Sequence, residues 1–165
     1  MSYAVRFSLL KWIKEHIPAG HVILELGSGS GTTQELSKTY QLHSVEHDKE
    51  WLHKYRSHYI HAPLINGWYD PAIHEQLPRL YNLLIIDGPP GKDRVNVIRH
   101  FNMFLLYVPV LIDDTERPGE KEIIKHLIGL GYFVIGEDKR FPAKQWTALS
   151  RKALFDGSGT AQETQ

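Results

Sequence analysis

Short apolar runs alternate with amphipathic stretches along most of this chain. The apolar runs have the length and composition of β-strands, whereas the stretches between them carry apolar residues at helical spacing. We expect strands at residues 22–26, 42–46, 59–65, 81–87, 108–112, 132–135 and 145–151. We expect helices at residues 2–17, 33–40, 48–55, 70–80, 95–106 and 118–130. This alternation predicts an α/β fold with a doubly wound sheet of about seven strands.

The chain has 165 residues, which is the size of one domain with a substantial core. Its last part, residues 156–165, contains Gly, Ser, Thr and Gln without apolar anchors. We therefore expect a single domain at residues 1–155, followed by a flexible C-terminal tail at residues 156–165.

A glycine loop follows the first predicted strand. Gly27, Gly29 and Gly31 allow a sharp turn and a close approach of a ligand to the backbone. Thr32 or Thr33 can cap the next helix, whose free N–H groups attract polar or negatively charged ligand atoms. The spacing is G-x-G-x-G with Glu25 two residues before it, whereas a dinucleotide-binding loop reads G-x-G-x-x-G. A glycine-rich turn without a ligand is the alternative interpretation.

This E-x-G-x-G-x-G pattern resembles motif I of the Rossmann-like S-adenosylmethionine (SAM) methyltransferases. The resemblance implies a mostly parallel Rossmann-like sheet with an antiparallel terminal hairpin strand, and SAM as the cofactor. It also implies an acidic residue at the end of the second strand that binds the ribose, a position held by Glu46. The SAM-binding residues expected on this basis are Glu25, Gly27, Ser28, Gly29, Gly31, Glu46, Asn66 and Asp87.

Carboxylates also end two later strands. Asp87 follows the run Leu-Leu-Ile-Ile, and Asp113 and Asp114 follow Val-Leu-Ile. Adjacent carboxylates repel one another unless a positive charge lies nearby, and hard divalent cations such as Mg²⁺ prefer oxygen ligands. Asp87, Asp113 and Asp114 are therefore a candidate metal site.

These strand ends are similar to those of metal-dependent O-methyltransferases, and most similar to the branch with "IDG" and "DD" at the two ends. The resemblance implies a metal that holds a substrate hydroxyl, lowers its pKa and orients it toward the methyl group. Asp87 is then a catalytic residue, and Lys92 is the first candidate base after the Gly-Pro-Pro-Gly loop. The same loop resembles the D-P-P-Y motif of amino-methyltransferases, but no aromatic residue follows the prolines. Arg94 is a candidate to clamp an acidic substrate.

The composition indicates which partners and which cellular compartment to expect. Basic and acidic residues number 19 each, so no electrostatic footprint for nucleic acid is present. With no cysteine, neither disulfides nor thiolate chemistry contribute, and a reducing cytoplasm is the expected compartment. Charged residues interrupt the opening segment, unlike a signal peptide, and no apolar run reaches membrane-spanning length.

The leading hypothesis is a SAM-dependent methyltransferase that acts on a hydroxyl of a small molecule, such as a sugar. A divalent metal is a candidate to assist the methyl transfer. One alternative is a SAM- or nucleotide-binding module, or an assembly subunit, without its own turnover. Another is an NAD-dependent oxidoreductase, against which the glycine spacing argues. The compact length leaves little chain for a substrate lid, so either the acceptor site is open or a second copy closes it as a homodimer.

Overall fold

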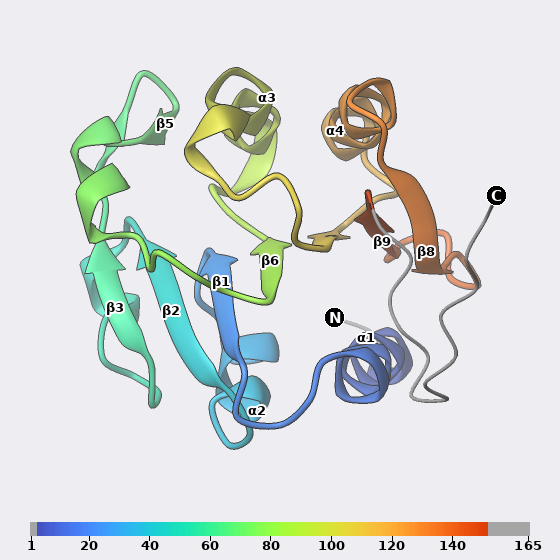
Figure 1. Ribbon diagram of the computed structural model, residues 1–165, viewed down its shortest axis with the longest axis horizontal. Coiled ribbons are helices and arrows are strands. Elements are labelled where there is room, and N and C mark those ends of the chain that lie inside the picture. Colours follow the sequence, from blue (N-terminus) through green and yellow to red (C-terminus); the bar gives the residue numbers. More distant parts are fainter. Residues whose placement is uncertain (1–2, 152–165) are drawn as a thin grey trace, which may run out of the picture.

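A computed structural model describes residues 3–151 of the chain. Its centre is a seven-stranded sheet in the order β3-β2-β1-β6-β7-β9-β8. The strands are β1 (Val22–Leu26), β2 (Gln41–Glu46), β3 (His58–His61), β6 (Leu83–Ile86), β7 (Val110–Asp113), β8 (Phe133–Asp138) and β9 (Trp146–Ser150). All run parallel except β9, which pairs antiparallel with both β7 and β8. The predicted doubly wound sheet with an antiparallel terminal strand is confirmed (Figure 1).

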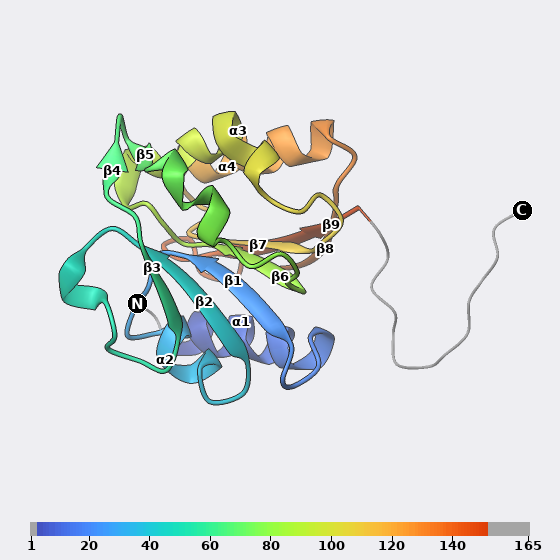
Figure 2. The same ribbon diagram turned by 60° about the vertical axis from the view of Figure 1, so that its left-hand side comes forward.

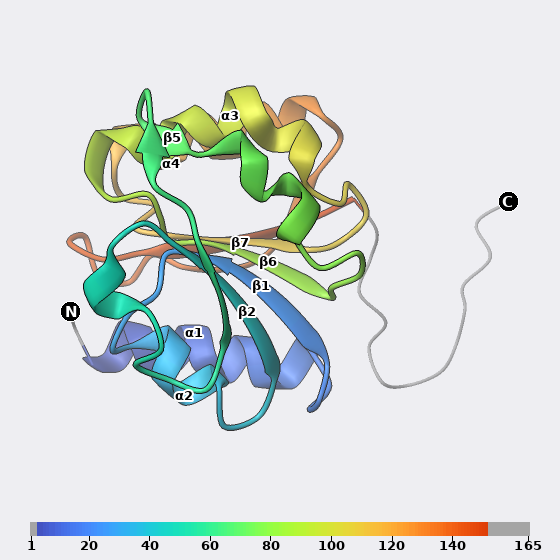
Figure 3. The same ribbon diagram turned by 90° about the vertical axis from the view of Figure 1, so that its left-hand side faces the viewer.

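Helices cover both faces of the sheet. The first face carries α1 (Tyr3–His16) and α2 (Thr32–Leu36), and the second carries α3 (Val97–His100) and α4 (Pro118–Gly129) (Figure 2). A small hairpin of β4 (Leu64–Ile65) and β5 (Trp68–Tyr69) also lies on the second face (Figure 3). None of the helices in residues 3–151 has the length and apolar character needed to cross a membrane.

The period of two along each strand divides the core between these faces. Ile23 of β1 belongs to the apolar cluster beneath α1 and α2, whereas Leu24 and Leu26 belong to the cluster beneath α3 and α4. Leu84 and Ile85 of β6 divide in the same way. The central strands are buried on both sides, which explains why their sequences are continuous apolar runs.

Several predicted elements are shorter in the structure. The helix expected at residues 48–55 is a single 3₁₀ turn, η1 (Lys49–Trp51), capped as expected by the Asp48 carboxylate, which accepts from Glu50 N at 2.9 Å. It ends because Leu52 is extended and His53 has a φ of 62°. The helices expected at residues 33–40 and 70–80 end early, at Leu36 and Gln76 (η2, Pro71–Gln76). The helix expected at residues 95–106 is divided among η3 (Gly91–Asn96), α3 and η4 (Phe101–Met103).

The strand expected at residues 59–65 is also divided. Pro63, which has no N–H to donate, separates β3 from β4. Asn66 and Gly67 then form a two-residue turn with φ values of 52° and 77°, the backbone that an Asn-Gly pair favours between antiparallel strands. The predicted tail at residues 156–165 lies outside the described residues.

A substitution at Gly136 of β8 tests how α1 packs on the sheet. A Cβ at this position would overlap the indole of Trp12, which lies against the strand. We expect Gly136→Ala to lower the free energy of unfolding by about 1–3 kcal/mol, because a buried ring must move. The measurement is urea unfolding.

Gly129→Ala, in α4, is the matched control. No heavy atom lies within 4 Å of a Cβ built there. This variant is expected to be unchanged or stabilised by about 0.5–1 kcal/mol. Equal effects of the two substitutions would contradict the proposed packing.

Candidate functional site

Two backbone turns meet where the strand order reverses, between β1 and β6. Gly27 follows β1 with a φ of 87°, and a Cβ there would lie 2.9 Å from Gly88 N. A Cβ on Gly88 would lie 2.8 Å from Gly27 Cα. Only glycine allows this close contact. In open α/β sheets, this switch point at the carboxyl ends of the strands is where ligands bind.

A cleft of about 320 Å³ opens at this point. It is lined by Gly27, Ser28, Glu46, His47, Asp48, Trp51, Tyr69, Asp87, Gly88 and Pro90. The structure thus brings together Gly27, Ser28, Glu46 and Asp87 of the residues predicted to bind SAM. The volume of the cleft is at the lower end of the range for small-molecule sites.

Glu46 ties the glycine loop to the end of β2. Its carboxylate is buried and accepts hydrogen bonds from Ser28 N and Asp48 N, both at 2.8 Å. His47 Nδ1 lies 2.8 Å from the same carboxylate. Glu46 therefore faces the cleft with its position fixed by backbone amides, as a ribose-binding carboxylate requires.

Tyr69 closes the cleft from the hairpin. Its hydroxyl is buried, lies against Gly88 and has no hydrogen-bond partner in the described part of the chain. Burial, with the nearby Glu46 carboxylate, holds the pKa of Tyr69 well above its usual value. A buried hydroxyl without a partner is costly, so a polar ligand atom is a natural partner for it. Tyr69 is therefore both packed in the core and part of the cleft lining.

Glu25 lies beneath the loop instead of in the cleft. The period of two turns its side chain toward α2, where Ser44 Oγ donates to it at 2.5 Å and Thr33 Oγ1 donates at 3.2 Å. Thr33 Oγ1 in turn accepts from Gly29 N at 2.8 Å. Burial raises the pKa of Glu25 to about 8, with the two hydroxyl donors opposing the shift. Glu25 therefore supports the loop from below.

Other predicted residues lie away from the cleft. Gly29 and Gly31 are not among its lining residues, and Gly31 lies against the Arg6 guanidinium. Asn66 is not among the residues that line this cleft, and its turn borders a separate hollow between the hairpin and α3. Lys92 is exposed at the start of η3 and is not part of the cleft lining.

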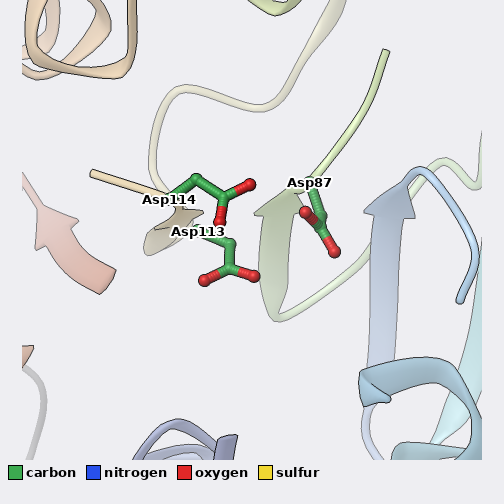
Figure 4. Close-up of side chains that lie close together, drawn as sticks. All are labelled: Asp87, Asp113 and Asp114. Atoms are coloured by element: carbon green, nitrogen blue, oxygen red, sulfur yellow. The ribbon is translucent and has the colours of Figure 1, made fainter. Parts of the chain in front are cut away.

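Asp87, Asp113 and Asp114 converge as predicted. Figure 4 shows Asp87 at the end of β6 beside Asp113 and Asp114 at the end of β7. One carboxylate oxygen from each lies within 4.8 Å of the others. Asp114 has a φ of 61°, which turns the chain away from β7.

Cations of the chain itself reach this cluster. Lys144 Nζ lies 2.5 Å from Asp113 Oδ2 and also binds Asp114 Oδ1. Arg94 is buried, and its guanidinium lies 3.2 Å from Asp87 Oδ1 and 3.1 Å from Asp114 Oδ2. Arg94 is thus engaged within the protein instead of clamping a substrate. Lys144 gave no sequence signal, because it lies in an irregular loop far along the chain from the aspartates.

Burial and neighbouring charges together shift the pKa values of the aspartates. Burial raises the pKa of Asp87 to about 7, with repulsion from Asp113 adding to the shift and Arg94 opposing it. Burial also raises the pKa of Asp113. The pKa of Asp114 is lowered, because Lys144 and Arg94 outweigh the effect of burial.

Several solved structures are similar to this fold. The chain is similar to a solved methyltransferase from Pyrococcus furiosus, with a TM-score of 0.60 and 16% identity over 90% of this chain and 83% of that one. It is similar to the ribosomal protein L11 methylase of Lactobacillus delbrueckii subsp. bulgaricus, with a TM-score of 0.67 and 11% identity over 92% and 81%. The chain has the methyltransferase fold.

A third structure with this methyltransferase fold was solved with bound SAM. It is the magnesium protoporphyrin IX methyltransferase from Synechocystis PCC 6803, with a TM-score of 0.62 and 13% identity over 90% of this chain and 79% of that one. No family model matches the sequence, and no curated protein matches it. The likeness is therefore carried by the fold.

Glu25 makes a testable contribution to stability in this methyltransferase fold. Its pKa is about 8 in the folded chain and 4.5 ordinarily, so its stabilising effect is complete below about pH 4.5 and is lost as the pH rises through 8. Between pH 5 and pH 9, wild type should lose roughly 2–4 kcal/mol more unfolding free energy than Glu25→Gln. Urea unfolding at both pH values measures this difference, and parallel losses in the two proteins would contradict the assignment.

Proposed function

We propose that the chain is a SAM-dependent methyltransferase that transfers the methyl group to a hydroxyl oxygen of a small molecule. The observation that carries this proposal is the cleft at the switch point, where the glycine loop and the buried Glu46 carboxylate face one another. The methyltransferase fold supports it, because this edge of the sheet is where such folds place their ligand. The G-x-G-x-G spacing favours SAM over a nicotinamide dinucleotide.

The cleft residues fit an adenosine-bearing ligand. Glu46 would accept hydrogen bonds from the ribose hydroxyls, and the Tyr69 hydroxyl, which lacks a partner among the described residues, would bond a polar ligand atom. The Gly27–Gly88 contact keeps the floor of the cleft free of side chains. SAM, when bound, supplies a methyl group on a positively charged sulfur, so the protein supplies binding, orientation and proton transfer.

We assign to Asp87 the role of accepting the proton of the acceptor hydroxyl. It is the least buried of the clustered aspartates, with a quarter of its side chain exposed, and it lines the cleft. A carboxylate with a pKa of about 7 is suited to general-base work near neutral pH. Asp87 would take the proton of the acceptor hydroxyl as the oxygen receives the methyl group. We assign no step to Lys92, which lies outside the cleft lining. We also assign none to a divalent metal, because cations of the chain are paired with four of the six aspartate oxygens.

Binding of the reaction product tests the cofactor. Glu46→Gln should weaken binding of S-adenosylhomocysteine (SAH) by at least about tenfold, because it removes an ionised acceptor from the ribose. Isothermal titration calorimetry measures the affinity. Glu122→Gln, on the exposed surface of α4, is the matched control and should bind SAH like wild type. NAD binding with no SAH binding would support an oxidoreductase instead.

Methyl transfer tests the role of Asp87. A screen of small hydroxyl compounds with radiolabelled SAM should identify an acceptor, and the rate should rise as the pH passes through about 7, where Asp87 ionises. Asp87→Asn should lower the rate roughly 10²–10⁴-fold and flatten the pH profile, while its SAH affinity changes far less. SAH binding with no turnover on any acceptor would favour the binding-module alternative.

A further inference from the structure

The ammonium of Lys144 binds two of the three converging aspartates, Asp113 and Asp114. We propose that Lys144 is the resident cation of this cluster, holding the place that a divalent metal would take, so that the site is formed without a metal. This proposal goes beyond the function proposed above and holds whether or not the chain transfers a methyl group.

The contacts of Lys144 are those of a buried cation. Its Nζ reaches carboxylate oxygens of both Asp113 and Asp114, and only 12% of its side chain is exposed. A charge at this depth is costly unless it is paired, and here it is paired twice. Although burial opposes it, the two aspartates raise the pKa of Lys144, which keeps the ammonium charged.

Backbone contacts fix the loop that carries Lys144. Gln145 N donates to Glu116 Oε2 at 2.8 Å, and Gln145 O accepts from Thr115 N at 3.1 Å. Lys144 N donates to Phe141 O at 3.2 Å. The residue after Lys144 is therefore tied to the segment directly after Asp114. Lys144 is held against the cluster by the fold.

Arg94 also holds the cluster and pairs with two oxygens that Lys144 does not bind. It pairs with Asp87 Oδ1, with Asp114 Oδ2 and with Glu120 Oε1 at 3.2 Å. Arg117 also reaches Asp114 Oδ2, at 2.8 Å. Both oxygens of Asp114 are thus bonded to cations of the chain.

A divalent cation would have to compete with these groups. Mg²⁺ and Mn²⁺ require several oxygen ligands around one point, and Lys144 already binds one oxygen of Asp113 and one of Asp114. Among the described residues, Asp113 Oδ1 is the buried carboxylate oxygen of the three aspartates without a hydrogen-bond partner. Four of the six carboxylate oxygens of the three aspartates are paired with cations of the chain, so a divalent cation would have to displace one of these cations. Removal of Lys144 would free Asp113 Oδ2 and Asp114 Oδ1 beside Asp113 Oδ1 and leave their charges uncompensated.

Mn²⁺ binding tests the proposal, with electron paramagnetic resonance counting the bound ion. Wild type should show no site that depends on Asp113. Lys144→Met removes the charge and keeps the length of the side chain, so this variant should bind one Mn²⁺ at least about tenfold more tightly than wild type. The double variant Asp113→Asn/Lys144→Met should lose that site. Lys139→Met is the matched control, because Lys139 lies in the same loop but pairs with Glu137 at 2.6 Å on the surface.

Each outcome decides the question. Stoichiometric Mn²⁺ binding by wild type that Asp113→Asn abolishes would overturn the proposal, as would a folded Lys144→Met variant that binds no Mn²⁺. If Lys144→Met unfolds in EDTA, recovery of its circular dichroism on addition of Mn²⁺ is the expected result, and failure to recover would count against the proposal. Because no readout involves SAM, these results are separate from the test of methyl transfer.

Discussion

Buried carboxylates at one edge of the sheet are the constraint on which this site depends. The parallel strands end at the same edge, so Glu25, Glu46, Asp87, Asp113 and Asp114 gather there, away from most of the solvent. Each has to be protonated, hydrogen-bonded or paired. The loops around the edge are arranged to meet this requirement.

The solutions differ from strand to strand, and the differences separate structural from functional roles. Glu25 is favoured in its protonated form beneath the loop, and Glu46 is held by backbone amides. Asp113 and Asp114 are neutralised by Lys144 and Arg94. Asp87 keeps a partly exposed carboxylate with a raised pKa beside the cleft, which suits it for proton transfer. In the proposed function, this edge of the sheet has a binding half on β1 and β2 and a reactive half on β6 and β7.

The sequence predicts the parts of this arrangement that local patterns control. Apolar runs predicted the strands, and the positions of Glu46, Asp87 and Asp113 at strand ends predicted their meeting at one edge. Lys144 was missed because its contact with Asp113 spans 31 residues and depends on how the loop after β8 folds back. Asn66 lies in the tight turn of the β4–β5 hairpin and does not line the cleft, a placement that the strand predicted at residues 59–65 did not anticipate. The helix predicted at residues 48–55 is a single 3₁₀ turn because Leu52 is extended and His53 takes a positive φ, which periodicity does not reveal.

A crystal structure of the complex with SAH tests the central claim most directly. The account predicts the adenosine in the cleft between the Gly27 turn and Glu46, with the ribose hydroxyls on the Glu46 carboxylate and the sulfur directed toward Asp87. Ligand bound elsewhere, such as in the hollow beside Asn66, or a cleft that stays empty at saturating SAH, would contradict the account.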